Sequence, residues 1–173
     1  MKEIAAFEKV SCHQFRADAE KVERWAELDI ERIFSTIRLP KRATSGSAGY
    51  DIFSPFSFEL AQGEELLIPT GLRCRIEEGW VLMIFPRSGL GSRYRFQLNN
   101  TVGIIDSDYY GAENEGHILI HMINDSRDGK VLSVEKGDAI VQGVFLPFGV
   151  VRAEQTSASR TGGFGSTDNK KRK

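Results

Sequence analysis

Apolar residues recur at steps of three and four between Ala17 and Ile37, with glutamate and arginine between them. Spacing of this kind puts apolar side chains on one face of a helix. Pro40 cannot continue a helix. The pattern therefore predicts one amphipathic helix over about residues 17–37, whose apolar face is formed by Val22, Trp25, Ala26, Ile30, Ile33, Phe34 and Ile37.

Beyond Pro40 the chain changes to short apolar runs separated by turn residues. The runs are rich in β-branched and aromatic residues, which favour strands. They read YDIFSPFSF, EELLIPTGLRCRI, WVLMIFPRSGL, TVGIIDSDYY, HILIHMIN and DAIVQGVFLPF, and turn signals stand at Gly63, Gly79, Gly129 and Gly137. This arrangement predicts an all-β barrel or sandwich.

The final segment, residues 154–173, differs in composition from the rest. It is rich in Ser, Thr, Gly and Lys, and Phe164 is its only large apolar residue. Such a segment has little to bury, so we expect a flexible tail. A chain of 173 residues is near the usual size of one domain. We therefore expect residues 1–153 to form a single domain that includes the helical segment.

Charge and hydropathy narrow the class of protein. The chain has 23 basic and 24 acidic residues and a formal net charge of -1, which gives no general attraction to nucleic acid. We interpret the basic end, Lys170 to Lys173, as a solvated terminus. No apolar run approaches the roughly 18 residues that span a bilayer, and the start lacks a signal-peptide pattern. We expect a cytoplasmic protein with neither a membrane nor a nucleic-acid partner.

The cysteines and histidines predict no metal centre. Cys12 and Cys74 are too few for a disulfide framework and have no ligand partners at zinc-like spacing, so both should be reduced thiols. His117 and His121 are four residues apart, but the segment between them reads as a strand, where such a pair is too far apart to share an ion.

Two polar segments interrupt the apolar runs. Pro86 to Gly89 combines an arginine, a hydroxyl and a flexible backbone, which suit phosphate oxygens, although an ordinary turn has the same composition. Asp106 to Tyr109 puts two carboxylates beside an aromatic ring at a strand end. One of them is a candidate general base, and an Asp-rich turn is the alternative.

A third segment, Gly162 to Thr167, is glycine-rich and lies in the tail. It reads either as low-complexity chain or as a segment that orders over a bound ligand. In the second case Phe164 would stack on a ring, and Arg160, Ser166 and Thr167 would contact phosphates.

The order of these segments carries more information than any one of them. Five motifs follow one another: Gly46–Ile52, Pro86–Leu90, Gly103–Gly111 preceded by Asn99-Asn100, Gly137–Gln142, and Arg160 with Gly162–Thr167. In this order the chain resembles the trimeric dUTPase family from about residue 39 to residue 169. The resemblance implies a jelly-roll-like β-barrel and hydrolysis of dUTP to dUMP and pyrophosphate, a step that supplies dUMP for nucleotide metabolism.

The resemblance also assigns roles to individual residues. Asp106 is implied as the base that orients water for in-line attack on the α-phosphorus. Tyr109 would pack on the deoxyribose, and backbone groups around Asn100 and Gly103 would recognise uracil. The implied phosphate ligands are Arg87, Ser88, Gly89 and Gln142, and the implied lid residues are Arg160, Phe164, Gly165, Ser166 and Thr167.

A metal ion and an assembly are implied as well. Mg²⁺ would be held by the triphosphate and waters, with no direct protein ligand and with Asp51 in its outer coordination sphere. A homotrimer would share each active site among its subunits.

The sequence departs from the family pattern at a few places. Residues 112–115 are an insertion beside the third motif, and Ala139 replaces a usual arginine. The fifth motif is one residue shorter between Arg160 and Gly163. The helical segment is extra, and we expect it to be a surface or interface element without a catalytic role.

Two other functions remain open from the sequence. A dCTP deaminase shares the expected fold and would use a glutamate at the pyrimidine, for which Glu113 or Glu115 could serve. A nucleotide-sensing trimer without turnover would keep the binding groups alone.

Overall fold

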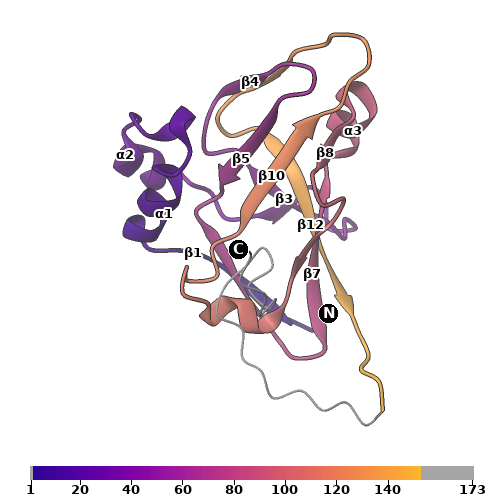
Figure 1. The fold of residues 1–173 in the computed structure, drawn as a ribbon. Helices are drawn as coiled ribbons and strands as arrows, with labels where there is room; N and C mark the ends of the chain where they lie inside the picture. Colours follow the sequence, from indigo (N-terminus) through magenta and orange to yellow (C-terminus); the bar gives the residue numbers. More distant parts are fainter. Residues whose placement is uncertain (1, 153–173) are drawn as a thin grey trace, which may run out of the picture.

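A computed structural model describes residues 2–152, and strands dominate it (Figure 1). All but the first strand fall after Pro40, in the region where the sequence predicted strands, which confirms the all-β class. The strands are β1 Ala5–Lys9, β2 Lys41–Arg42, β3 Tyr50–Phe53, β4 Phe58–Leu60, β5 Glu65–Pro69, β6 Leu72–Ile76, β7 Trp80–Pro86, β8 Phe96–Leu98, β9 Gly103–Ile105, β10 Leu119–Asn124, β11 Leu132–Val134 and β12 Ala139–Pro147.

The strands pair antiparallel in four sheets of a jelly-roll-like barrel. The largest sheet has the order β2-β3-β12-β7-β9, and a second has the order β5-β10-β8. Two further pairs are β1 with β6 and β4 with β11. Strand β12 therefore lies between β3 and β7, strands that come from early and middle parts of the chain.

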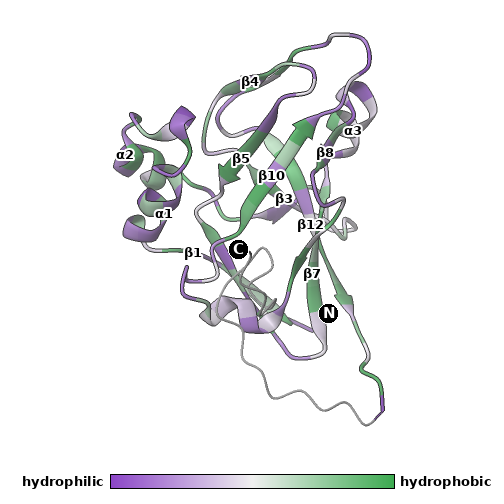
Figure 2. Cartoon of the chain, viewed as in Figure 1, coloured by the Kyte–Doolittle hydropathy of each residue, from purple (hydrophilic) through white to green (hydrophobic). Residues whose placement is uncertain are grey.

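Side chains alternate between core and surface along the strands, as the pleat of a strand requires. In β10, Ile120 and Met122 are buried while His121 between them is partly exposed. In the neighbouring β5, Leu66 and Ile68 are buried in the same way. Figure 2 shows the apolar stretches of these two strands side by side in the barrel.

The prediction of one continuous helix over residues 17–37 is wrong. The chain forms α1 Cys12–Ala19, a 3₁₀ turn η1 Glu23–Trp25 and α2 Ile30–Ser35. Val22 has extended backbone angles, φ -109° and ψ 109°, which interrupt the helix after α1. Asp29 then starts α2, because its carboxylate accepts a hydrogen bond from the Arg32 N–H at 3.1 Å.

The apolar spacing predicted one helix because the apolar residues are indeed buried. They reach the core, however, from separate short elements and not from one helix. Trp25, Ile30 and Ile37 all lie in the core. The Trp25 ring stacks on Phe56 with centroids 4.2 Å apart, and its indole N–H donates to the Leu67 carbonyl at 3.0 Å. Burying such a side chain contributes about 1.5–3 kcal/mol, whereas ordinary residues differ in helix propensity by less than about 1 kcal/mol each.

The strand β1 was not predicted. It precedes α1 and pairs with β6, where Phe7 lies opposite the buried Cys74. Phe7 packs against Tyr50 and Phe145, with ring centroids 5.6 and 5.8 Å away. Cys12 and Cys74 are free thiols, and burial raises the pKa of Cys74 to about 12.

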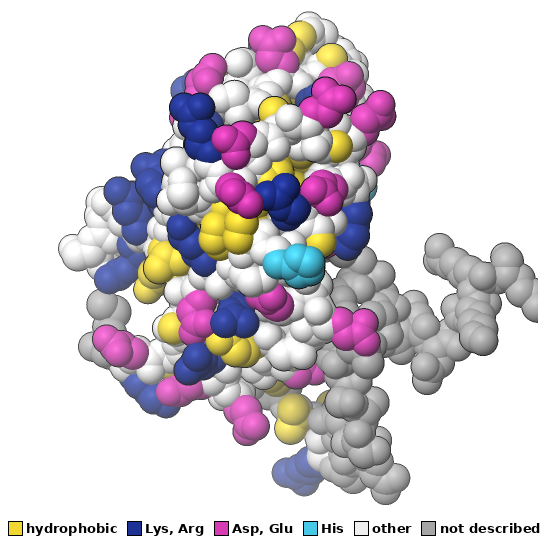
Figure 3. Space-filling view, turned by 90° about the vertical axis from the view of Figure 1, so that its left-hand side faces the viewer, with side chains coloured by type: hydrophobic (Ala, Val, Ile, Leu, Met, Phe, Trp, Pro, Cys, Tyr) yellow, Lys and Arg dark blue, Asp and Glu magenta, His cyan; other side chains and the backbone are white. Residues whose placement is uncertain are grey.

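The surface mixes charges of both signs. Figure 3 shows the side of the molecule at the left of Figure 1, where acidic and basic side chains are interspersed with a few apolar ones. Among the helices of residues 2–152, none has the length and apolar character needed to cross a membrane.

A buried hydrogen bond between Asp18 and His117 joins α1 to the barrel. The Asp18 carboxylate lies 2.6 Å from Nδ1 of His117, and the two side chains are 4% and 0% exposed. Nε2 of His117 accepts the Gly71 N–H at 2.8 Å, so the ring proton lies on Nδ1 and is donated to Asp18. Gln14 and Lys21 each donate to the same carboxylate at 2.7 Å.

The pKa of Asp18 reflects two opposing effects. Burial raises this pKa, but the hydrogen bonds from His117, Lys21 and Gln14 outweigh burial and hold the pKa well below its ordinary value. Because the folded chain holds a proton on Asp18 less tightly than the unfolded chain, the carboxylate stabilises the fold above the unfolded pKa of about 3.9. This contribution decreases as the pH falls below the unfolded pKa, and it is lost once the pH falls through the lower pKa of the folded state.

Asp18→Asn should lower the free energy of unfolding at neutral pH by about 2 kcal/mol, because the amide cannot replace a charged acceptor of three hydrogen bonds. Urea denaturation at one protein concentration, at about pH 7 and about pH 3, measures the effect. The gap between variant and parent should narrow at the lower pH. Asp128→Asn, which breaks an exposed pair with Lys130, should not change stability measurably. An equal gap at both pH values would contradict this account of Asp18.

Candidate functional site

Three of the predicted motifs come together in the five-stranded sheet β2-β3-β12-β7-β9, which we call the central sheet. Asp51 on β3 lies opposite Gln142 on β12, and Gln142 lies opposite Phe85 on β7. Arg87 follows the last residue of β7 and donates to the Asp51 carboxylate, which forms an ion pair with it. Residues of the first, second and fourth motifs therefore lie side by side at one end of the sheet.

Gly49 shows how closely the first and fourth motifs approach. A Cβ atom at this position would lie 2.6 Å from Oε1 of Gln142, a separation that no side chain tolerates without movement. The amide of Gln142 in turn donates to the Pro86 carbonyl at 3.4 Å. A larger residue at position 49 would therefore have to displace the end of the Gln142 side chain.

A group of residues around Arg87 has the chemistry of an anion site. We call it the Arg87 cluster, and it consists of Arg87, Asp51, Ser88 and Gly89. The Arg87 side chain is 38% exposed while that of Asp51 is 13% exposed, so one end of the guanidinium is held and the rest faces solvent. Ser88 and Gly89 are exposed at the start of α3 Ser88–Tyr94. A fixed guanidinium beside a hydroxyl can bind phosphate oxygens with defined geometry.

The third motif begins with the turn between β8 and β9. Asn100 is exposed at the tip, and its carbonyl accepts the Val102 N–H at 2.8 Å. Thr101 has a positive φ of 72°, and its N–H donates to the Leu98 carbonyl at 2.9 Å. Gly103 then starts β9 opposite Ile84. The turn is tight, and its backbone groups have fixed directions.

The motif continues into the 3₁₀ helix η2 Ser107–Gly111. Asp106 immediately precedes η2 and is partly buried, whereas Asp108 is exposed. Tyr109 is 6% exposed, and its hydroxyl donates to the His117 carbonyl at 2.8 Å. The Nδ2 of Asn114 donates to the same hydroxyl at 2.8 Å.

Within one chain, Asp106 and Arg87 lie near opposite ends of strand β7. In the β7–β9 pair, Ile105 lies opposite Leu82 and Gly103 lies opposite Ile84. Asp106 is therefore at the level of the start of β7, whereas Arg87 follows its end. At about 3.3 Å per residue these two side chains are separated by about 20 Å along the strand.

The other predicted site residues are Arg160, Phe164, Gly165, Ser166 and Thr167, which lie outside the described residues. Within residues 2–152 there is no group of three or more His, Cys, Asp or Glu side chains that could hold a metal ion. Asp51 is paired with Arg87, so its carboxylate orients a cation of the protein.

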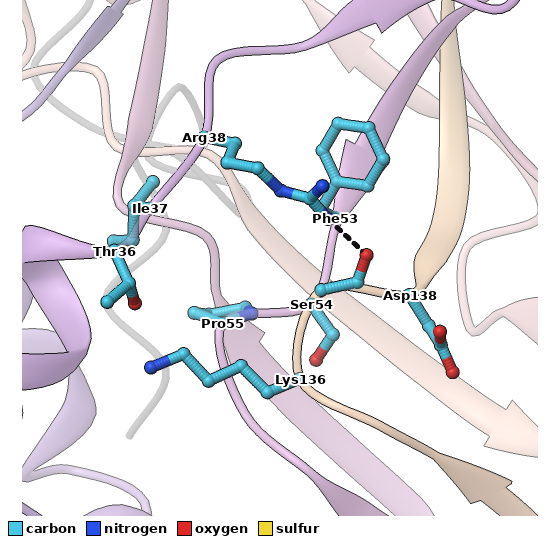
Figure 4. A pocket seen from close by; sticks show the side chains of 9 residues that line it. Thr36, Ile37, Arg38, Phe53, Ser54, Pro55, Lys136 and Asp138 are labelled. Carbon is cyan, nitrogen blue, oxygen red and sulfur yellow. Dashed lines mark hydrogen bonds between the residues drawn. The ribbon is translucent and has the colours of Figure 1, made fainter.

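A cavity of about 320 Å³ lies elsewhere, between the end of α2 and the turn into β12 (Figure 4). Arg38 crosses it, donates to the Gly137 carbonyl and lies over the Phe53 ring, with its guanidinium carbon 4.1 Å from the ring centroid. Phe53 pairs with Ala139, so Arg38 puts a cation beside the position where the family pattern has arginine. Neither Asp106 nor Arg87 lines this cavity.

The insertion at residues 112–115 lies against the third motif. Glu115 accepts hydrogen bonds from the N–H and the hydroxyl of Ser11 at 2.7 and 2.6 Å. These bonds lower the pKa of the Glu115 carboxyl, against a smaller effect of burial. This carboxylate is therefore held by the segment before α1.

The contacts of Tyr109 with Asn114 and His117, and the support of His117 by Asp18, were not predicted from the sequence. Asn114 lies in an insertion, His117 read as part of a strand, and Asp18 lies about a hundred residues away in the chain. No local pattern connects such residues, since the fold alone brings them together.

Comparison with known proteins places this arrangement in a family. The family model described as dUTPase matches residues 35–168. The deoxyuridine 5'-triphosphate nucleotidohydrolase of Lactococcus lactis is 46% identical over 134 residues, which cover 76% of this chain and 88% of that protein.

Solved structures show the same fold. A crystal structure of the dUTPase from Streptococcus mutans superposes with a TM-score of 0.63 at 33% identity, covering 86% of this chain and 99% of that one. A point mutant of the dUTPase from the S. aureus phage phi11, described with a structural Mg(II) ion, has a TM-score of 0.57 at 24% identity over 70% of this chain and 90% of its own. By family model, sequence and fold, the chain belongs to the dUTPase family.

Proposed function

We propose that this protein hydrolyses dUTP to dUMP and pyrophosphate by attack of water on the α-phosphorus. Membership of the dUTPase family supports the reaction. The observation that carries the site is the register of the central sheet, which groups Arg87, Asp51 and Gln142 and sets Asp106 at the other end of β7.

In this mechanism Asp106 is the general base. Its carboxylate accepts a proton from water as the water oxygen bonds to the α-phosphorus, and the bond from that phosphorus to the bridging oxygen breaks. Pyrophosphate leaves with the bonding electrons. General-base assistance of this kind contributes about 10²–10⁴ in rate, and the remainder comes from positioning and charge neutralisation.

The phosphates of the substrate bind at the Arg87 cluster. Asp51 holds the Arg87 guanidinium in one orientation, so its free N–H groups can bind phosphate oxygens together with Ser88, Gly89 and Gln142. Arg160, Phe164, Gly165, Ser166 and Thr167 form the lid in this proposal. Mg²⁺ on the triphosphate neutralises charge when bound, and the protein needs no dedicated ligands for it, with Asp51 at most in its outer coordination sphere.

The turn around Asn100 and Gly103 reads the base. An extra methyl group in an apolar pocket changes binding by only about 1–3 kcal/mol, so thymine must be excluded sterically by rigid backbone. Cytosine presents a different donor and acceptor pattern and would leave buried backbone groups unpaired, at about 1–3 kcal/mol each. Tyr109 packs on the sugar and leaves no room for a 2'-hydroxyl.

The separation of Asp106 from Arg87 supports a homotrimer with shared sites. Since about 20 Å divides these residues within one chain, a substrate that touches both must lie between subunits. A ring of heterologous contacts puts the Arg87 end of one subunit beside the Asp106 end of the next. We expect this trimer to act in the cytoplasm.

The alternative of a dCTP deaminase finds less support. Glu115 is held by Ser11 and is therefore committed to the fold, which leaves Glu113 as the candidate acid. Release of ammonia from dCTP would favour that reaction. Binding of dUTP without formation of dUMP would favour a nucleotide sensor.

Asp106→Asn should lower kcat for dUTP by about 10²–10⁴, because the amide cannot accept the proton of the attacking water. Binding of a non-hydrolysable α,β-imido analogue should be retained, since the amide keeps the shape of the carboxylate. Pyrophosphate release with Mg²⁺ and dUTP, dTTP, dCTP or UTP measures turnover, and calorimetry measures binding. Asp128→Asn, on the remote loop before β11, is the matched control and should keep full activity. Near-normal turnover of Asp106→Asn would remove this residue as the base.

Two inactive variants should restore activity when they share a trimer. Asp106→Asn and Arg87→Ala subunits, refolded together in equal amounts, should form intact sites wherever Asp106 of one subunit meets Arg87 of its neighbour. Random mixing gives about a quarter of the sites both intact residues. The two variants assayed after separate refolding are the controls. Failure of the mixture to exceed them would argue that each site lies within one subunit.

Deletion of residues 160–173 should reduce kcat/KM for dUTP at least tenfold while leaving the thermal midpoint nearly unchanged, because a segment with one large apolar residue is expected to contribute little to stability. Deletion of residues 170–173 alone removes the basic end and should have no effect. An active enzyme after the longer deletion would exclude the lid.

A further inference from the structure

The hydroxyl of Tyr109 is held from two directions. It donates its proton to the His117 carbonyl at 2.8 Å and accepts the Asn114 Nδ2–H at 2.8 Å. Nδ2 of Asn114 also lies 3.4 Å from the same carbonyl. With its ring 6% exposed, Tyr109 has its position fixed by these two partners.

The segment that supplies both partners folds back on η2. Oδ1 of Asn114 accepts the Gly116 N–H at 3.2 Å, and the Asn114 carbonyl accepts the His117 N–H at 3.0 Å. Glu115 and Gly116 both have positive φ, 58° and 70°. A Cβ atom on Gly116 would lie 2.6 Å from the Tyr109 carbonyl oxygen, so the segment packs directly on the backbone of the third motif.

The first and last turns of the N-terminal helix α1 hold this segment in place. Ser11, the N-cap of α1, donates twice to Glu115. Asp18, in the last turn of α1, accepts the His117 ring N–H at 2.6 Å. Helix α1 is therefore linked to His117, and the His117 carbonyl and the Asn114 side chain both contact the Tyr109 hydroxyl.

These supports come from parts of the chain where the family pattern gives little guidance. The family model begins at residue 35, after α1, and residues 112–115 are the insertion beside the third motif. The N-terminal segment is therefore in contact, through two polar links, with the motif on which sugar recognition depends.

We propose that α1 and residues 112–117 form a support for Tyr109, with Asn114, His117 and Asp18 as positioning residues that determine the discrimination between deoxyribose and ribose. The inference rests on the proposed function, in which Tyr109 packs on the sugar. Discrimination against a 2'-hydroxyl requires that the tyrosine ring cannot move away from the added oxygen. Two hydrogen bonds to a buried hydroxyl supply that restraint.

Asn114→Asp tests the support directly, because the new side chain has the same size and keeps an acceptor for the Gly116 N–H. It removes the donor to Tyr109, and the tyrosine proton can then satisfy either the carboxylate or the His117 carbonyl. We expect the ratio of kcat/KM for dUTP to kcat/KM for UTP to fall about tenfold. Asn114→Ala, which removes all three hydrogen bonds of the Asn114 side chain, should lower the ratio at least as far and serves if the first variant does not fold.

The double variant separates positioning from a merely structural role. Tyr109→Phe has no hydroxyl, so adding Asn114→Asp to it should not change the ratio further. If Asn114 only caps the loop, its effect should persist in the Tyr109→Phe background. Asp128→Asn, in the exposed loop before β11, should leave the ratio at the parental value.

Thermal unfolding of each variant identifies any loss of fold. A parental ratio in folded Asn114→Asp and Asn114→Ala, or equal effects of Asn114→Asp with and without the Tyr109 hydroxyl, would overturn the inference. Failure of the proposed function gives a different result, because the parent protein itself would then release no pyrophosphate from dUTP.

Discussion

The register of β12 between β3 and β7 is the constraint on which the site depends. Pairing with β3 sets Gln142 opposite Asp51, and pairing with β7 sets the same residue beside the strand end that carries Arg87. A slip of one residue in either pair would turn Gln142 to the other face of the sheet and separate the three motifs. The same sheet, through β7 and β9, fixes Asp106 about 20 Å from Arg87. Sheet geometry therefore groups Arg87, Asp51 and Gln142 and at the same time keeps Asp106 away from them. This separation is the physical basis of the proposed site between subunits.

Much of this could be predicted from the sequence because the relevant signals are local. Apolar runs broken by glycines identified the strands after Pro40, and motif order identified the family and the candidate residues of each motif. The helix over residues 17–37 failed for a non-local reason: Trp25 and Ile30 are buried by Phe56 and the barrel, and this packing does not need one helix axis. Strand β1 was missed because only its partner β6 makes it a strand.

The candidate site was predictable to the same extent. Residue types and order make Arg87, Asp106 and Tyr109 candidates, but the pairing of Arg87 with Asp51 and the distance between Arg87 and Asp106 follow from the fold. The Asp18–His117 pair joins residues about a hundred positions apart, so no local pattern connects them. Buried polar pairs of this kind satisfy one another, so neither partner leaves a trace in the local pattern.

Two adjacent tyrosines show how the N-terminal segment can affect chemistry without touching substrate. Tyr109 is reached from α1 through His117, and the Tyr110 hydroxyl donates to Glu8 of β1 at 2.7 Å. Discrimination between nucleotides that differ by one hydroxyl depends on small displacements in a rigid site, and rigidity comes from the residues behind it. Sequence changes in β1 and α1 can therefore alter selectivity while all five motifs stay the same. On this argument an element outside the family's common core is part of the machinery that sets specificity.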